Sequence, residues 1–275
     1  MVSEFIISLE SMNKSTKVLI VIPARMASTR LPGKVLVDLN GKPMIQWVWE
    51  QARQAKLAND VIIATDDEQV FERAQGFGAK VMMTSPFHKS GTERVAEVAN
   101  RLNFDLVINL QGDEPLFSPV AIDQMIETML GSESIQMASL RVEIQELSDY
   151  LNPNVVKVIV DNQDNAIYFS RHPIPYFRGM DELLEKWEKT GFRPPELVPP
   201  PYKHLGIYGF RFDFLNALVH LPVTELEQAE KLEQLRALVW GFKIKVSETA
   251  YDSVSIDTPE DLEKVRRMLG ENQSR

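Results

Sequence analysis

In the first part of the chain, short and continuous apolar runs alternate with longer amphipathic stretches. The apolar runs at 18–22, 61–64, 80–83 and 106–110 are rich in aliphatic residues, a pattern typical of strands that are buried on both faces. Between these runs, apolar residues recur every three to four positions, which predicts helices with one buried face. Strands that alternate with helices in this way indicate a parallel sheet with right-handed crossover connections.

The second half of the chain has more strand-like runs and fewer helices between them. We expect strands at 136–142, 155–160, 166–169, 204–210 and 243–246, and helices at 225–239 and 259–269. Both halves together predict a Rossmann-like α/β fold. In this fold a mostly parallel mixed sheet is flanked by helices, and a second α/β subregion follows the first.

Two segments depart from this pattern. Residues 1–16 precede the first convincing strand and lack the arrangement of a signal peptide, so we expect a disordered leader before a single domain at 17–275. The stretch 178–201 is charged and rich in proline, and we expect it to be an exposed excursion from that domain.

Composition narrows the classes of function. The chain has 275 residues and a formal net charge of −9, which disfavours binding to nucleic acid because a phosphate backbone requires a basic surface. No apolar run is long enough to span a membrane, so we expect no membrane insertion. The chain has no cysteine, which excludes disulfides, thiolate catalysis and cysteine-based zinc sites, and which fits a cytoplasmic protein.

Polar residues follow the strands of the first half, at the edge where open α/β sheets bind their ligands. Pro23-Ala24-Arg25 follows the first strand, and the loop continues through Arg30 and Lys34. The three cations of this loop suit a triphosphate, which needs several positive donors. The spacing of a P-loop is absent. The alternative interpretation is a basic loop that is simply solvated.

Four further features have an ordinary structural interpretation, and the first two also have a chemical one. Asp113 lies on the turn after the fourth strand, where its carboxylate could hold a hard divalent cation or serve only the turn. Residues 90–94 open a helix, whose first backbone N–H groups suit an anion or a base edge but can also be capped locally. Asp257 or Thr258 could cap the last helix. His204 lies in an apolar strand, where a histidine is more often a hydrogen-bonded core residue.

Eight short motifs occur in order along the chain: IPAR at 22–25, STRLPGK at 28–34, SGTER at 90–94, NLQGDEP at 109–115, YFSR at 168–171, HLGIYG at 204–209, LEQLR at 232–236 and DTPEDL at 257–262. This series resembles the 3-deoxy-manno-octulosonate cytidylyltransferases, or CMP-Kdo synthetases, over nearly the whole chain. The opening loop is shared with CMP-sialic acid synthetases. HLGIY and LEQLR are much more specific to the Kdo enzymes.

The resemblance implies an enzyme that couples CTP to the eight-carbon acid sugar Kdo, releases pyrophosphate and forms CMP-Kdo for lipopolysaccharide biosynthesis. The family uses magnesium, works in the cytoplasm and is usually a homodimer. Residues 17–135 would bind CTP, and residues 136–275 would bind the sugar acid and the second subunit. The nearest alternative is a cytidylyltransferase for another acid sugar, such as 8-amino-Kdo or a sialic acid. A non-catalytic nucleotide-binding protein is the distant alternative.

The resemblance also implies a role for individual residues. The nucleotide site would comprise Pro23, Ala24, Arg25, Arg30, Lys34, Ser90, Gly91, Thr92, Arg94, Gln111 and Gly112. The sugar-acid pocket would comprise Arg171, His204, Tyr208, Glu233 and Gln234, with the Arg171 guanidinium as a partner for the Kdo carboxylate. Asp113 and Asp257 would hold magnesium and, with Lys34, would be the catalytic residues.

Overall fold

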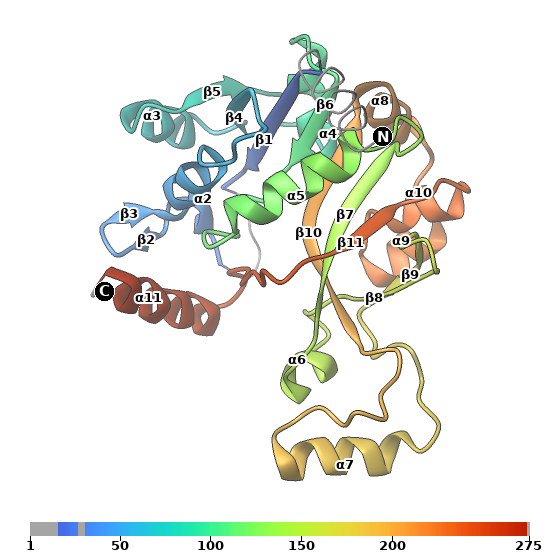
Figure 1. Cartoon of the computed structure of the whole chain (residues 1–275). Coiled ribbons are helices and arrows are strands. Elements are labelled where there is room, and N and C mark those ends of the chain that lie inside the picture. The colour runs from blue at the N-terminus through green and yellow to red at the C-terminus, as the bar shows by residue number, and fades with distance from the viewer. Residues whose placement is uncertain (1–15, 27–30, 274–275) are drawn as a thin grey trace, which may run out of the picture.

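The computed structural model describes residues 16–26 and 31–273, so the expected leader lies almost entirely outside the described residues. Within them, a nine-stranded mixed sheet forms the centre of the molecule, and helices pack on both of its faces (Figure 1). This is the α/β architecture that the alternation of strands and helices predicts.

The large sheet has the spatial order β11 (Lys245–Glu248), β7 (Met137–Glu143), β10 (Tyr202–Arg211), β6 (Leu106–Asn109), β1 (Val18–Ala24), β4 (Asp60–Thr65) and β5 (Lys80–Met83), and β8 (Lys157–Val160) and β9 (Ala166–Ser170) extend it from β10. β2 (Asp38–Leu39) and β3 (Lys42–Pro43) form a separate two-stranded sheet. β6, β1, β4 and β5 are parallel to one another. β10 pairs antiparallel with both β6 and β7, so the two halves of the chain share one sheet.

The helices connect these strands and cover the sheet. They are the 3-10 turn η1 (Lys34–Leu36), α2 (Met44–Ala52), α3 (Glu68–Gly76), α4 (Gly91–Asn100), α5 (Pro119–Leu130), α6 (Leu147–Leu151), α7 (Met180–Thr190), α8 (Phe212–His220), α9 (Glu225–Glu230), α10 (Leu235–Val239) and α11 (Pro259–Gln273). In the described part of the chain, none of them is both long and apolar enough to cross a membrane.

β1 lies in the middle of the sheet, and its side chains alternate between two hydrophobic cores. Val18, Ile20 and Ile22 pack on one face with residues of α2 and α5. Leu19 and Val21 pack on the other face with residues of α4 and α8. All five side chains are at most 1% exposed. The continuous apolar run of β1 therefore reflects burial on both faces, and it places the end of the strand at the centre of the molecule.

The helix that we expected at 225–239 is wrong, because two short helices occupy this stretch. α9 ends at Glu230, Lys231 adopts a left-handed conformation with φ of 54°, and α10 begins only at Leu235. The Glu227 carboxylate of α9 forms an ion pair of 2.5 Å with Arg236 of α10, which holds the two pieces together. The apolar period continues through the break, so the sequence pattern does not reveal it.

The stretch 178–201 is not simply an exposed excursion, because it contains the helix α7. Trp187 of this helix is 1% exposed and packs with Tyr150, Phe177 and Leu197 in a small core of its own. Figure 1 shows α6 and α7 projecting away from the main sheet on the strands and loops that follow β7 and precede β10. The arm, which we define as residues 144–151 and 173–201, is therefore folded around its own apolar centre.

Candidate active site

A cavity of about 510 Å³ lies beside the end of β6, where the two halves of the sheet meet. Its walls come from β10, from the start of α4, from the break between α9 and α10, and from the segment that leads into α11. Most of the side chains that line it are polar or charged. The lining includes Gly91, Thr92, Gln111, Glu114, Lys203, His204, Tyr208, Glu233, Gln234, Ser253 and Asp257.

Lys34 joins Asp113 and Asp257 at the edge of this cavity. Its Nζ lies 2.5 Å from Asp113 Oδ2 and 3.0 Å from Asp257 Oδ1. Burial disfavours the charge on Lys34, but attraction to the two carboxylates outweighs this effect and raises the pKa of the ammonium above its ordinary value. Lys34 is therefore held as a cation between two carboxylates. We refer to these three residues as the Lys34 cluster.

Close backbone packing brings the parts of the Lys34 cluster together. A Cβ on Gly112 would lie 2.9 Å from the carbonyl oxygen of Pro23, so only glycine lets the turn after β6 pack against the end of β1. Ile256 N donates to Asp113 O at 2.9 Å, which joins the segment before α11 to the same turn. The sequence predicted that Asp113 and Asp257 meet, and the structure shows that they do.

The start of α4 is bound to the break between α9 and α10. Ser90 caps α4 by accepting a hydrogen bond from Glu93 N. Ser90 Oγ and Thr92 Oγ1 each donate to the Glu233 carboxylate at 2.8 Å. Burial raises the pKa of Glu233, although these two hydrogen bonds act in the opposite direction. Ser90 and Thr92, which were predicted to bind the nucleotide, thus contact Glu233, which was predicted to bind the sugar acid.

His204 and Tyr208 lie on β10, where an irregularity between Leu205 and Tyr208 shifts the register with β7. The ring nitrogen Nε2 of His204 is 2.8 Å from Ser139 Oγ. Burial lowers the pKa of His204 to about 3, so the imidazole is neutral at physiological pH. Burial also raises the pKa of Tyr208, which keeps its hydroxyl protonated. Both side chains line the cavity as neutral hydrogen-bonding groups.

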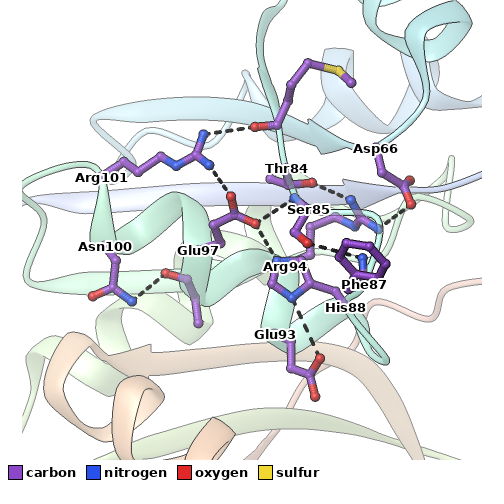
Figure 2. Close-up of polar contacts among 12 residues, drawn as sticks. Asp66, Thr84, Ser85, Phe87, His88, Glu93, Arg94, Glu97, Asn100 and Arg101 are labelled. Atoms are coloured by element: carbon purple, nitrogen blue, oxygen red, sulfur yellow. Dashed lines mark hydrogen bonds and ion pairs between the residues drawn. The ribbon is translucent and has the colours of Figure 1, made fainter.

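Arg94 does not appear among the described residues that line the cavity, although the sequence predicted it for the nucleotide site. Its side chain is 3% exposed, and its guanidinium contacts Thr84 Oγ1 and forms an ion pair of 3.1 Å with Asp66. Figure 2 shows this guanidinium between Thr84 and Asp66, and it shows Glu97 contacting Ser85 of the same loop. In this structure the Arg94 side chain therefore joins the loop that precedes α4 to Asp66, which follows β4.

Arg171 also lies outside the cavity lining in the described chain. Its guanidinium donates to three backbone carbonyls: Glu230 O at 2.7 Å, Pro153 O at 3.0 Å and Lys231 O at 3.4 Å. The first and third of these carbonyls belong to the break between α9 and α10. The second belongs to the loop 152–155, whose neighbouring residues form another wall of the cavity. The Arg171 guanidinium therefore binds the backbone of two segments of the cavity wall and does not itself line the cavity.

Of the remaining residues that were predicted for the nucleotide site, some line the cavity and others do not. Gly91 and Gln111 line the cavity, and Gln111 Nε2 donates to Asn109 Oδ1 at 3.0 Å. Arg25 is exposed at the end of β1, next to Pro23 and Ala24. Arg30 lies outside the described residues.

Among the lining residues to which the sequence assigned no role are Glu114, Lys203 and Ser253. Glu114 is 7% exposed; burial, reinforced by the neighbouring Asp113, raises its pKa to about 7. Lys203 Nζ donates to Asp252 Oδ1 at 2.8 Å and to Ser253 O at 2.6 Å. The adjacent Asp113 gave a signal for Glu114. Ser253 lies outside every motif, so no local signal was available for it.

The Lys34 cluster has the chemistry of a site for a hard divalent cation. No group of three or more acidic, histidine or cysteine side chains suited to a metal comes together within the described ranges. Magnesium, however, commonly uses only one or two protein carboxylates and completes its coordination with water and phosphate oxygens. Asp113 and Asp257 are two carboxylates that already converge on one ammonium group. This donor set fits magnesium bound together with a phosphate ligand.

Comparisons with known proteins agree on one family. A family model described as cytidylyltransferase matches residues 19–244. The 3-deoxy-manno-octulosonate cytidylyltransferase of Geobacter metallireducens is 48% identical over 256 residues, which cover 92% of this chain and 98% of that protein. The corresponding protein of Thermodesulfovibrio yellowstonii is 45% identical over 257 residues, with coverages of 90% and 96%. A solved CMP:2-keto-3-deoxy-manno-octonic acid synthetase complexed with CTP has a TM-score of 0.83 at 40% identity, covering 94% of this chain and all of its own.

Proposed function

This chain belongs to the family of 3-deoxy-manno-octulosonate cytidylyltransferases, and from that premise we propose how its site divides the work of the reaction. The reaction couples CTP with Kdo and yields CMP-Kdo and pyrophosphate, and activated Kdo serves lipopolysaccharide biosynthesis. We assign the phosphates of CTP to the Lys34 cluster and Kdo to the polar cavity beside it.

One observation carries this division. Asp257 belongs both to the Lys34 cluster and to the lining of the cavity, so a group bound at the cluster lies next to a group bound in the cavity. Transfer of a nucleotidyl group requires this arrangement, because the sugar hydroxyl must reach the α-phosphorus while pyrophosphate leaves on the other side. The protein accelerates such a step mainly by positioning the reactants and by neutralising charge.

The residues of the chain then have separate tasks. Lys34 places a permanent positive charge beside the phosphates, and the loop after β1 brings Arg25 to the same edge of the sheet. His204, Tyr208 and Gln234 offer neutral hydrogen-bonding groups to the sugar. Asp113 and Asp257 would hold magnesium. When bound there, this ion neutralises charge on the phosphate oxygens and orients them.

The test compares nucleotides and sugars as substrates. The purified chain is incubated with magnesium, with CTP or ATP, and with Kdo, 8-amino-Kdo or a sialic acid; pyrophosphate release is measured and products are identified by mass. We expect CMP-Kdo from CTP and Kdo, and little turnover with ATP. Equal turnover with ATP would contradict the proposal, and a preference for 8-amino-Kdo or a sialic acid would reassign the sugar.

We also propose that the enzyme works as a homodimer in the cytoplasm, as the resemblance to the family implies. Sedimentation equilibrium of the purified chain tests the first part, and a monomer across the working concentration range would contradict it. Cell fractionation with an antibody against the chain tests the second part.

A further inference from the structure

Three buried polar atoms belong to residues that line the same cavity and lack a partner of full hydrogen-bond geometry among the described residues: Glu114 Oε2, Gln234 Nε2 and Ser253 Oγ. Their residues are 7%, 4% and 4% exposed. Buried polar groups in proteins are nearly always paired, so three orphaned groups in one cavity indicate that a ligand completes their hydrogen bonds. Only Gln234 belongs to the predicted sugar pocket, and the two others have no assigned role.

Glu114 and Ser253 are held firmly in the cavity wall. A Cβ on Gly206 would lie 2.9 Å from Glu114 Oε1, so the glycine in β10 makes room for this carboxyl group. The backbone oxygen of Ser253 accepts from Lys203 Nζ at 2.6 Å, which ties its segment to the same strand. The Ser253 side chain lies close enough to the Glu114 carboxyl to oppose the rise in its pKa as a hydrogen-bond donor does, but Glu114 Oε2 and Ser253 Oγ have no partner of full hydrogen-bond geometry within the described chain.

The hydrogen-bonding properties of Glu114, Gln234 and Ser253 indicate which kind of ligand group these side chains can bind. A carboxyl oxygen accepts hydrogen bonds and repels phosphate or carboxylate oxygens, and Asp113 next to Glu114 strengthens this repulsion. A serine hydroxyl both donates and accepts, and the Gln234 amide nitrogen donates. Neutral hydroxyl groups satisfy all three, because each hydroxyl donates one hydrogen bond and accepts others. An anionic group would pair with Glu114 only while its carboxyl is protonated.

We propose that Glu114 and Ser253 form, together with Gln234, a subsite that binds hydroxyl groups of the sugar acid. This proposal rests on the proposed function, since it takes the sugar acid to be the occupant of the cavity. Glu114 Oε2 accepts from one hydroxyl of the sugar, and Ser253 Oγ and Gln234 Nε2 donate to hydroxyl oxygens. The subsite therefore fixes the polyol part of the sugar.

The first experiment measures steady-state kinetics of Glu114→Gln and Ser253→Ala with CTP and Kdo. Each variant should raise the KM for Kdo about tenfold, the effect of one lost hydrogen bond to a substrate hydroxyl, with the KM for CTP within about twofold. Glu72→Gln on the exposed side of α3 and Ser132→Ala in an exposed turn repeat the same chemical changes elsewhere and should leave both constants unchanged. An unchanged KM for Kdo in both subsite variants, or a parallel rise for CTP, would overturn the proposal.

The second experiment separates direct contact from a structural role. Wild type and both variants are assayed with a series of Kdo analogues, each lacking one hydroxyl group. If Glu114 binds a particular hydroxyl, removing that hydroxyl should cost wild type affinity but cost Glu114→Gln little, whereas the other analogues should affect both proteins equally. If none of the hydroxyl groups shows such coupling, the proposed subsite is wrong. Should Glu114→Gln fail to fold, Ser253→Ala answers the same question.

Wild type distinguishes the two levels of failure. If wild type forms no CMP-Kdo, the proposed function is wrong. If wild type forms CMP-Kdo and binds the analogues without coupling to Glu114 or Ser253, the function stands and the hydroxyl subsite is wrong.

Discussion

At the scale of single residues, the start of α11 shows how a cap and a site residue divide their roles. Thr258 Oγ1 accepts a hydrogen bond from Asp261 N, and the Asp261 carboxylate accepts from Thr258 N at 2.9 Å. These two residues cap the helix reciprocally, so Asp257 is not needed for that task and contacts Lys34. The local sequence left Thr258 and Asp257 equally suited to capping, because the partner of Asp257 lies far away in the chain.

The carboxylates of the Lys34 cluster can be tested by removing their charge. Asp113→Asn and Asp257→Asn keep the size of the side chain but remove a proposed magnesium ligand, so each variant should fold and lose about 100-fold or more in turnover. The double variant should be little worse than the worse single one, because both residues act through the same ion. Thermal melts and steady-state rates are measured on all three. If the two carboxylates have only a structural role, the variants should keep nearly full activity and lose about 1 kcal/mol of stability.

His204 makes stability depend on pH in a definite direction. Its pKa is about 3 in the folded chain, below the ordinary value of 6.5, so the folded state binds the proton less tightly than the unfolded state. The stability that this difference confers is complete above pH 6.5 and is lost as the pH falls from 6.5 toward 3. Between pH 6.5 and 4.5 the loss amounts to about 2–3 kcal/mol.

Urea unfolding at pH 6.5 and 4.5 measures this loss in wild type and in His204→Gln, whose amide nitrogen can replace Nε2 toward Ser139. Glu114, with its pKa of about 7, also titrates in this range but contributes equally to both proteins. The difference between the two proteins therefore isolates His204. Equal losses in both proteins would contradict the assignment.

At the scale of elements, the break between α9 and α10 shapes the site more than either helix does. Lys231 adopts its left-handed conformation at the break, and the next three residues line the cavity. Arg171 fixes the break from behind through the carbonyls of Glu230 and Lys231. One continuous helix could not present three consecutive residues to one cavity, because successive side chains on a helix point in different directions.

Two substitutions at Lys231 test this conclusion as a matched pair, since both remove the charge. Glycine adopts φ of 54° freely, whereas the branched side chain of valine strongly resists it. Lys231→Val should lose about 1–2 kcal/mol of stability relative to Lys231→Gly and should bind Kdo more weakly. Urea midpoints and the KM for Kdo check the prediction. Identical behaviour of the two variants would show that the break does not depend on this residue.

The alternating strands and helices of the first half were predictable because the spacing of apolar residues that marks each kind of element is a local property of the sequence. The same reasoning missed α5 at Pro119–Leu130, although its buried residues recur at helical spacing, and it joined α9 to α10. Arg171, which is distant in the sequence, donates to the carbonyls of Glu230 and Lys231 at the break, and such tertiary contacts are not visible in the local pattern. Within the site, motifs identified Asp113 and Asp257, whereas Ser253 could be found only from the cavity itself.

At the scale of the whole molecule, β10 holds the two halves together while the arm stays apart. β10 pairs with β6 of the first half and with β7 and β8 of the second half. The arm, residues 144–151 and 173–201, has its own small core around Trp187. The sheet is therefore expected to unfold as one cooperative unit, and the arm is expected to open locally at lower free energy.

Hydrogen exchange followed by mass spectrometry tests this prediction. Trp187→Ala should remove about 3 kcal/mol of packing from the arm and speed amide exchange in α6 and α7 only. Exchange in β1, β6 and β10, and the affinity for CTP, should remain as in wild type. Trp240→Ala replaces a tryptophan that is 48% exposed and serves as the control. Loss of protection in β10 as well would show that the arm and the sheet form one unit.

The bond from Ile256 to Asp113 and the contact of Asp257 with Lys34 also have a consequence for synthesis of the protein. A ribosome releases Lys34 and Asp113 long before Asp257, so the nucleotide edge can form on the nascent chain while the second carboxylate is still missing. The growing chain therefore lacks the complete Lys34 cluster until all the strands of the large sheet have been made. Translation that stops before residue 256 yields a product without the complete cluster, whatever portion of it folds.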